Sequence, residues 1–189
     1  MTDFTIHTQE TAPAASKPLL DKSLKAFGRV PGLHGVLAEA PKALEAYQIL
    51  GTLFKDTSLT TIEQHVVWLT INYENDCGYC VPAHTGLAKF DGVPDAVIKA
   101  LRNGTPIADP KLESLRAFTV QVVNQRGWVA DNDVQAFLDA GYTHQQILEV
   151  ILGLAHKVIS NYTNHLAKTP VDAGFKQFAW KKPVAAKAA

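Results

Sequence analysis

Apolar residues recur along this chain at the three- and four-residue spacing of an amphipathic helix, in segments bounded by helix-capping residues. No segment alternates apolar and polar residues between turn signals, as a strand would. The pattern therefore predicts an all-α fold, a compact domain of about eight helices. Pro31 and Gly32 should interrupt the chain between the first two helices. The helices are expected at about residues 16–27, 41–54, 60–73, 77–90, 94–104, 110–126, 131–140 and 143–167.

The chain length of 189 residues fits one domain with a substantial core. Residues 1–16 are polar and carry proline and alanine, so they are predicted to form an extended arm. Residues 17–179 are predicted to form the single helical domain. Residues 180–189, rich in lysine and alanine, are predicted to be a tail that orders only against a partner subunit.

Charge and hydropathy exclude several classes of protein. Lys plus Arg and Asp plus Glu are both 18, so no basic excess is available for nucleic acid. The N-terminus lacks the basic and apolar regions of a secretory signal, and no apolar run has the length of a membrane span. A cytoplasmic protein without nucleic-acid or membrane partners is therefore expected.

The only two cysteines, Cys77 and Cys80, form one short motif with His84. Pro82 is tolerated only in a first turn, so a helix should begin near residues 76–79. The three side chains would then share one helical face, and the helix N-terminus would favour thiolate over thiol. His84 could take a proton from Cys80, and two sulfurs at this spacing can close into a disulfide. The motif predicts a dithiol redox centre.

Other interpretations of these residues remain open. The cysteines could be small buried apolar residues. A zinc site could use Cys77, Cys80, His84 and His65, but ligands along a single helical face point in similar directions and no second ligand pair is visible. We therefore expect no metal. The last helix carries polar groups that could line a pocket or an interface, although buried hydrogen bonding explains them more simply: His156, Asn161, Asn164 and His165.

The segment from Leu59 to His84 resembles the alkylhydroperoxidase D-like, or carboxymuconolactone decarboxylase-like, family. The shared pattern is a helix, a short break, and then Cys-x-x-Cys-x-x-x-His opening the next helix. The resemblance is clear over about residues 40–104 and looser through the last helix.

The resemblance implies an all-helical protein that assembles into trimers or hexamers and reduces hydroperoxides without a cofactor. One cysteine would become a sulfenic acid, the other would close the disulfide, and an external dithiol would reset the pair. The resemblance assigns Cys80 as the activated thiol and Cys77 as the more accessible one. The helix dipole alone would favour Cys77, which lies nearer the N-terminus.

The chain departs from this family pattern at two positions. Peroxidase members carry a proton-relay glutamate twelve residues before the first cysteine, where this chain has His65. The nearest carboxylate, Glu63, is about 200° away around a helix and fits a capping box with Thr60. We favour His65 as the relay and keep Glu63 as the second candidate. The other departure is Tyr79, where peroxidase members can carry another relay histidine.

The sequence thus predicts an enzyme, a thiol-dependent peroxidase or dithiol–disulfide oxidoreductase. A decarboxylase or lactone-processing enzyme with the same fold is an alternative, and it would not need the cysteine pair. A non-enzymatic redox-sensing module is another, and it would form a reversible disulfide with little peroxide turnover.

Overall fold

The structure is a computed structural model that describes residues 3–183. Within that range the chain forms nine α-helices, two 3-10 helices and no strand, which confirms the predicted all-α class. The elements are η1 (Ala14–Ser16), α1 (Lys17–Phe27), α2 (Gly32–Leu37), α3 (Pro41–Lys55), α4 (Thr61–Glu74), α5 (Cys80–Phe90), α6 (Asp95–Asn103), α7 (Pro110–Asn124), α8 (Asp131–Asp139), α9 (His144–Ala167) and η2 (Ala173–Phe178). The ends of the predicted arm and tail, 1–2 and 184–189, lie outside the described residues.

The helix boundaries follow the capping residues. Thr60 and Glu63 form the predicted capping box at the start of α4, and Thr143 forms another with Gln146 at the start of α9. Gly104 ends α6 in the left-handed conformation that glycine adopts without strain. Each of these helix ends therefore satisfies some of its free backbone groups locally.

One helix, α2, was not predicted from the sequence. Pro31 does interrupt the chain, but it is also the N-cap of this six-residue helix, and all six residues are buried. Two of the six are glycines, which have low helix propensity. A Cβ added to Gly35 would lie 2.7 Å from Ile6 and 2.8 Å from the His7 carbonyl oxygen. Close packing against the N-terminal segment therefore stabilises α2 despite its composition.

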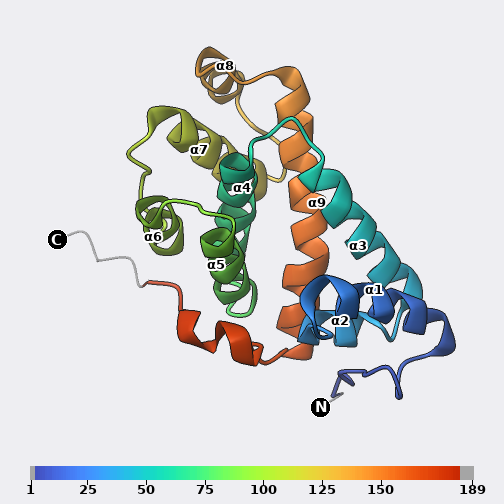
Figure 1. Cartoon of the computed structure of the whole chain (residues 1–189). Helices are drawn as coiled ribbons and strands as arrows, with labels where there is room; N and C mark the ends of the chain where they lie inside the picture. The colour runs from blue at the N-terminus through green and yellow to red at the C-terminus, as the bar shows by residue number, and fades with distance from the viewer. Residues whose placement is uncertain (1–2, 184–189) are drawn as a thin grey trace.

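Helix α4 lies at the centre of the domain, between α9 and α3 on one side and α5, α6 and α7 on the other (Figure 1). Residues 63–72 of α4 are all buried, so the helix has no solvent-facing side over that stretch. The main apolar core surrounds it, and a second cluster joins α1 and α2 to the cysteine motif. None of the helices in the described part of the chain has the length and apolar character of a membrane span.

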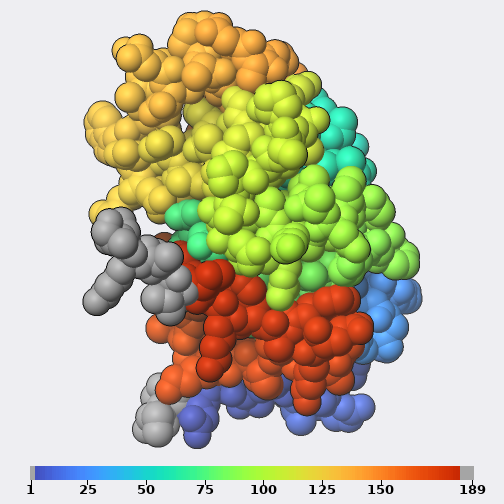
Figure 2. Space-filling view, turned by 90° about the vertical axis from the view of Figure 1, so that its left-hand side faces the viewer, coloured from blue at the N-terminus to red at the C-terminus, as the bar shows by residue number. Residues whose placement is uncertain are grey.

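The segment after α9 folds back across α5 and α6, where Figure 2 shows it in red against the green residues of that region. A Cβ added to Gly86 of α5 would lie 2.7 Å from the Phe175 ring. The Trp180 indole N–H donates to the Arg102 carbonyl at 2.8 Å, and an Arg102 N–H donates to the Phe178 carbonyl at 3.1 Å. The described start of the predicted tail thus contacts its own chain, whereas we expected it to order only against a partner subunit.

Candidate active site

The cysteine pair lies at the N-terminus of α5. Asp76, with φ of 52°, turns the chain after α4, and the Cys77 amide donates to the Asn72 carbonyl at 3.0 Å. Helix α5 begins at Cys80, so Cys77 precedes it instead of sharing its face. The Cys80 amide donates to the Cys77 sulfur at 3.3 Å. Both cysteines are free thiols.

The two thiols differ in acidity. Burial alone would raise the pKa of Cys80, but the hydrogen bond to Cys77, the positive charge of Lys157 and the amides of Asn164 and Asn161 outweigh burial and lower this pKa to about 7. The Asn164 amide donates to the Cys80 sulfur at 3.3 Å. The hydrogen bond to Cys80 and burial raise the pKa of Cys77. The arrangement favours the thiolate on Cys80, in agreement with the resemblance and against the simple helix-dipole argument.

The two cysteines do not differ in solvent exposure in the way that the resemblance implies. Cys77 is 0% exposed and Cys80 is 2% exposed, so the prediction that Cys77 is the more accessible thiol is wrong for this chain. Cys80 lines a cavity of about 160 Å³, together with Lys157, His84 and Tyr79, and Cys77 is not among the residues that line it. This cavity therefore gives a small molecule a route to the pair from the side of Cys80.

His84 is placed differently from its predicted role as a base for Cys80. Its Nε2 lies 2.7 Å from the Lys157 Nζ, and no hydrogen bond joins it to either thiol among the described residues. Burial and then the charge of Lys157 hold the pKa of His84 well below its usual value. The ring is therefore neutral near pH 7, and its Nε2 accepts a hydrogen bond from the protonated amine.

Lys157 is the site residue that the sequence analysis missed. It is 0% exposed, and its Nζ lies 5.7 Å from the ring centroids of both Tyr47 and Trp68. Burial lowers the pKa of Lys157 to about 8, although the charges of Cys80 and Cys77 oppose this effect. A signal was available in the sequence, because Lys157 shares the buried face of α9 with Gly153, Ser160 and Asn164.

Buried amides connect α9 to the turn that carries the cysteines. The Asn161 amide donates to Asn72 at 2.8 Å and accepts from Asn75 at 2.8 Å. Together with the contact from Asn164 to Cys80, these bonds fix the distance between α9 and the pair. The polar residues at 161 and 164 thus hydrogen-bond inside the chain, as the simpler interpretation held, whereas His165 is exposed.

Of the two relay candidates, only His65 lies at the cavity. Its Nε2 is 2.8 Å from an Asp91 carboxylate oxygen. Burial lowers the pKa of His65, and Asp91 opposes this effect. Glu63 instead accepts hydrogen bonds from the amide and hydroxyl of Thr60, both at 2.8 Å, and is not among the cavity-lining residues. The Trp68 ring contacts both His65 and His84, with ring centroids 5.7 and 5.2 Å away.

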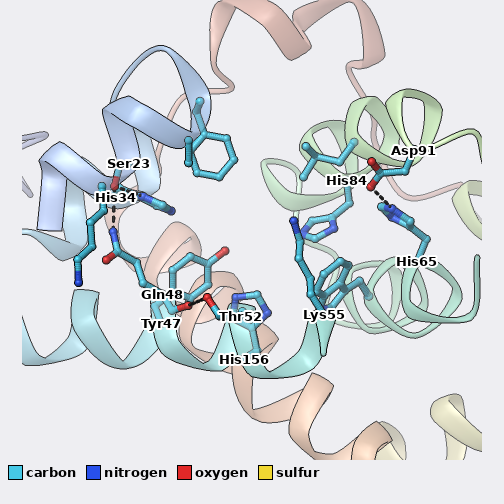
Figure 3. A pocket seen from close by; sticks show the side chains of 16 residues that line it. Ser23, His34, Tyr47, Gln48, Thr52, Lys55, His65, His84, Asp91 and His156 are labelled. Atoms are coloured by element: carbon cyan, nitrogen blue, oxygen red, sulfur yellow. Dashed lines mark hydrogen bonds and ion pairs between the residues drawn. The ribbon is translucent and has the colours of Figure 1, made fainter. Parts of the chain in front are cut away.

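A larger cavity of about 320 Å³ adjoins the one at Cys80, and both are lined by His34, Tyr47 and His84. Figure 3 shows its side chains converging from α1 and α2 on one side, from α4 and α5 on the other, and from α3 and α9 below. Burial keeps four of its histidines neutral by lowering each pKa: His34, to about 4, and His65, His84 and His156. The volume lies at the lower end of the range typical of small-molecule sites.

The residues considered as zinc ligands do not form a metal site here. Over residues 3–183, no group of three or more His, Cys, Asp or Glu side chains is arranged to hold a metal ion. His84 and His65 instead contact Lys157 and Asp91. The geometry at the pair is that of a dithiol beside a buried amine.

Comparison with known proteins identifies the fold. No protein-family profile and no curated protein sequence matches the chain. Among solved structures, it is similar to an alkylhydroperoxidase AhpD core protein, an uncharacterised peroxidase-related protein from Ralstonia eutropha JMP134. The TM-score is 0.80 at 19% identity, covering 93% of this chain and 96% of that one. An uncharacterised peroxidase-related protein from Silicibacter sp. TM1040 gives 0.75 at 14%, covering 93% and 96%.

The debrominase Bmp8, solved in complex with 2,3,4-tribromopyrrole, gives a TM-score of 0.78 at 14% identity, covering 94% of this chain and 95% of that one. These likenesses show that the chain has the alkylhydroperoxidase D-like fold. The fold implied by the resemblance around the cysteine motif is therefore confirmed over nearly the whole chain.

Proposed function

We propose that the chain is a thiol-dependent oxidoreductase that reduces organic hydroperoxides through Cys77 and Cys80. The observation that carries the proposal is the asymmetry of the pair. The Cys80 thiol, with a pKa of about 7, lines a cavity, and the Cys77 thiol beside it has a raised pKa. A nucleophilic thiolate next to a protonated resolving thiol is the arrangement that disulfide formation requires.

In the proposed reaction, the Cys80 thiolate attacks the hydroperoxide, the O–O bond breaks, and Cys80 becomes a sulfenic acid. The Cys77 thiol then displaces water from this sulfur to close the disulfide. The larger cavity would hold the organic part of the peroxide. Because the cavity reaches Cys80 and not Cys77, an external dithiol would attack the disulfide at Cys80. A small dithiol suits this route better than a protein surface.

The test is a thiol count before and after addition of one equivalent of cumene hydroperoxide to the reduced protein. Loss of two thiols with formation of cumyl alcohol supports the proposal, and an unchanged thiol count overturns it. Cys77→Ser and Cys80→Ser serve as controls. A decarboxylase or lactone-processing enzyme would keep its activity in Cys77→Ser, and a redox-sensing module would close the disulfide without repeated turnover in excess dithiol.

Reductive removal of halogen from an aromatic ring is a second candidate. The aromatic lining of the larger cavity, with Phe27, Tyr47 and Trp68, favours it, and a debrominase shares the fold. The two thiols would supply two electrons, so that an aryl halide becomes the arene and halide is released as the disulfide closes. Incubating the reduced protein with 2,3,4-tribromopyrrole and measuring bromide distinguishes this candidate from peroxide reduction.

We also infer self-association, which the family resemblance implies as trimers or hexamers. One face of α9 exposes large apolar side chains at helical spacing: Leu148, Ile151, Tyr162 and Leu166. Leu148 is 66% exposed and Leu166 is 72% exposed, which is unusual for a pair of leucines on one helix face. A second copy of the chain would cover this face.

A further inference from the structure

Lys157 is a fully buried cation without a carboxylate partner. None of the ion pairs in residues 3–183 includes it, and the hydrogen bond of its Nζ goes to the neutral His84 ring. An unpaired buried charge is strongly unfavourable, so the amine needs a counter-ion or must lose its proton. The cysteine pair supplies the negative charge that acts on it, Cys80 first, and Cys80 is the thiol whose pKa is lowered to about 7.

Peroxide reduction at Cys80 removes this counter-ion. When the thiolate becomes a sulfenic acid and then a disulfide, the charge that favours the protonated amine is lost, and its proton is less stabilised. The carboxylate that also lines this cavity, Asp172, is bonded to the Tyr79 hydroxyl and paired with Arg29. In the same step the departing oxygen of the hydroperoxide needs a proton, because an alkoxide is a poor leaving group at neutral pH. The leaving oxygen therefore needs a proton in the same step in which the Lys157 ammonium becomes less stable.

We propose that Lys157 is the general acid of the dithiol cycle, which protonates the departing alkoxide when Cys80 is oxidised and regains the proton when the pair is reduced. The proposal rests on the function proposed above. In the first step, the Cys80 thiolate, the hydroperoxide and the Lys157 ammonium give the sulfenic acid, an alcohol and the neutral amine. Condensation with the Cys77 thiol then releases water. Reduction by an external dithiol returns one proton to Lys157 and leaves Cys80 as the thiolate.

The geometry suits this role. Cys80, His84 and Lys157 line the same small cavity, so a peroxide that meets the Cys80 sulfur has its leaving oxygen in the cavity that contains the amine. The His84 Nε2 holds the Nζ at 2.7 Å as an acceptor and thereby orients its remaining protons. The aromatic rings of Tyr47 and Trp68 stabilise the cation without competing for the proton. His84 is accordingly a positioning residue.

The pH dependence of the rate distinguishes the charge of Lys157 from its proton. In the wild-type protein, the rate of single-turnover oxidation by cumene hydroperoxide should rise with pH through the pKa of Cys80, about 7, and fall through the pKa of Lys157, about 8. Lys157→Arg keeps a permanent charge, so the rising limb should stay while the falling limb disappears and the plateau drops about 100-fold. Lys157→Gln should also shift the rising limb to higher pH, because the thiolate loses its cation.

A purely structural lysine would lower the rate without changing the shape of this profile. A falling limb that stays intact in Lys157→Arg, whether or not the rate is lower, would therefore overturn the proposal. The exposed Lys99→Gln is the matched control, with the wild-type profile expected. Circular dichroism checks that each variant is folded.

A second measurement follows the titration of Lys157 directly in the wild-type protein, without peroxide. In protein labelled with ¹³C at the lysine side chains, Lys157 is assigned by the signal missing from Lys157→Arg. Its pKa is followed in the reduced protein and after oxidation of the pair with diamide. The proposal predicts a lower pKa in the disulfide form, and an equal pKa in the two forms refutes it. A lowered pKa in a chain that turns over no peroxide would overturn the proposed function while supporting the proton coupling.

Discussion

Asn164 contacts the Cys80 sulfur through one end of its amide, while its Oδ1 is buried and has no partner among the described residues. A hydrogen bond to a charged group contributes about 1.5 to 3 kcal/mol. The amide therefore favours the thiolate specifically, since it donates more strongly to the anion than to the thiol. Leucine has nearly the same shape and lacks the donor.

Asn164→Leu should raise the pKa of Cys80 by about one unit, because about 1.4 kcal/mol corresponds to one unit. The measurement is the ultraviolet absorbance of the thiolate as a function of pH. Asn132→Leu, on the exposed face of α8, controls for the added apolar side chain. A titration curve identical to that of the wild type would show that Asn164 does not stabilise the thiolate.

The order of events at the two cysteines gives a second residue-level prediction. In Cys77→Ser, Cys80 should still react with cumene hydroperoxide and stop at the sulfenic acid, which dimedone traps and mass spectrometry detects. Cys80→Ser should give no adduct, because the raised pKa of Cys77 leaves that thiol protonated. An adduct confined to Cys80→Ser would reverse the assignment of the attacking cysteine.

At the scale of elements, α4 carries two residues that the sequence offered as proton relays. Glu63 belongs to the capping box at the helix start, and His65 reaches the cavity two residues later. Their side chains point in different directions, as the helical rotation between them requires. The two substitutions should therefore affect different properties of the protein.

Glu63→Gln keeps an acceptor for the capping box but removes the negative charge at the helix N-terminus, so it should lower the free energy of unfolding by up to about 1 kcal/mol and leave the rate of peroxide reduction unchanged. His65→Gln keeps a donor for Asp91 but cannot carry a proton, so the rate should fall about tenfold or more. Denaturant unfolding and single-turnover kinetics measure the two effects. A slow Glu63→Gln beside a fast His65→Gln would assign the relay to Glu63.

Much of the helical framework was predictable because its determinants are local. The apolar stripe and the Thr60 cap predict α4, and Gly104 predicts the end of α6. Helix α2 was missed because its stability comes from packing against residues 6 and 7, which lie outside its own sequence. Local pattern therefore predicts helices that carry their own signals, and not those that tertiary contacts stabilise.

The pair itself was also predictable, but its chemical environment was not. Cys77, Cys80 and His84 lie within eight residues of one another, so spacing alone brings them together. Lys157 and Asn164 reach the pair from α9, more than 70 residues further along the chain. Sequence can mark them as polar residues on a buried helix face, but only the packing of α9 against the motif assigns them to Cys80.

At the scale of the whole molecule, four elements bring neutral histidines to one cavity. In the folded chain burial lowers the pKa of His34 from 6.5 to about 4. Below pH 6.5 the unfolded chain binds more protons than the folded one, so stability is complete above that pH and falls as the pH drops towards 4. His34 alone can account for about 3 kcal/mol at most over that range.

The free energy of unfolding should therefore decrease steadily from pH 6.5 to pH 4, as measured by urea denaturation. His34→Gln should flatten this dependence, and a substitution of the exposed His144 by glutamine should not. The Ser23 hydroxyl bonded to His34 Nδ1 at 2.7 Å can be satisfied by the glutamine amide. An equally steep dependence in His34→Gln would exclude this histidine as the cause.

The exposed face of α9 gives a prediction about assembly. If a second copy covers it, Leu166→Asp should shift the mass measured by light scattering towards the monomer, because a carboxylate would be buried at the interface. Trp128→Asp removes an even more exposed apolar residue elsewhere, 87% exposed, and should leave the mass unchanged. A wild-type chain that is monomeric at high concentration would refute the inference.

Tyr79, between the two cysteines, holds the end of the chain against the site. Its hydroxyl donates to Asp172 at 2.7 Å, and the same carboxylate accepts from the Gly32 amide at 3.1 Å. Asp172 and Phe175 also line the cavity beside Cys80. A segment that follows the last long helix thus contributes to the enclosure of the cysteine pair. A chain that ended after α9 would keep both cysteines but lose two of the residues that line the cavity beside Cys80. Its thiols would then be open to oxidants and alkylating agents of any size, without the selectivity that the cavity provides.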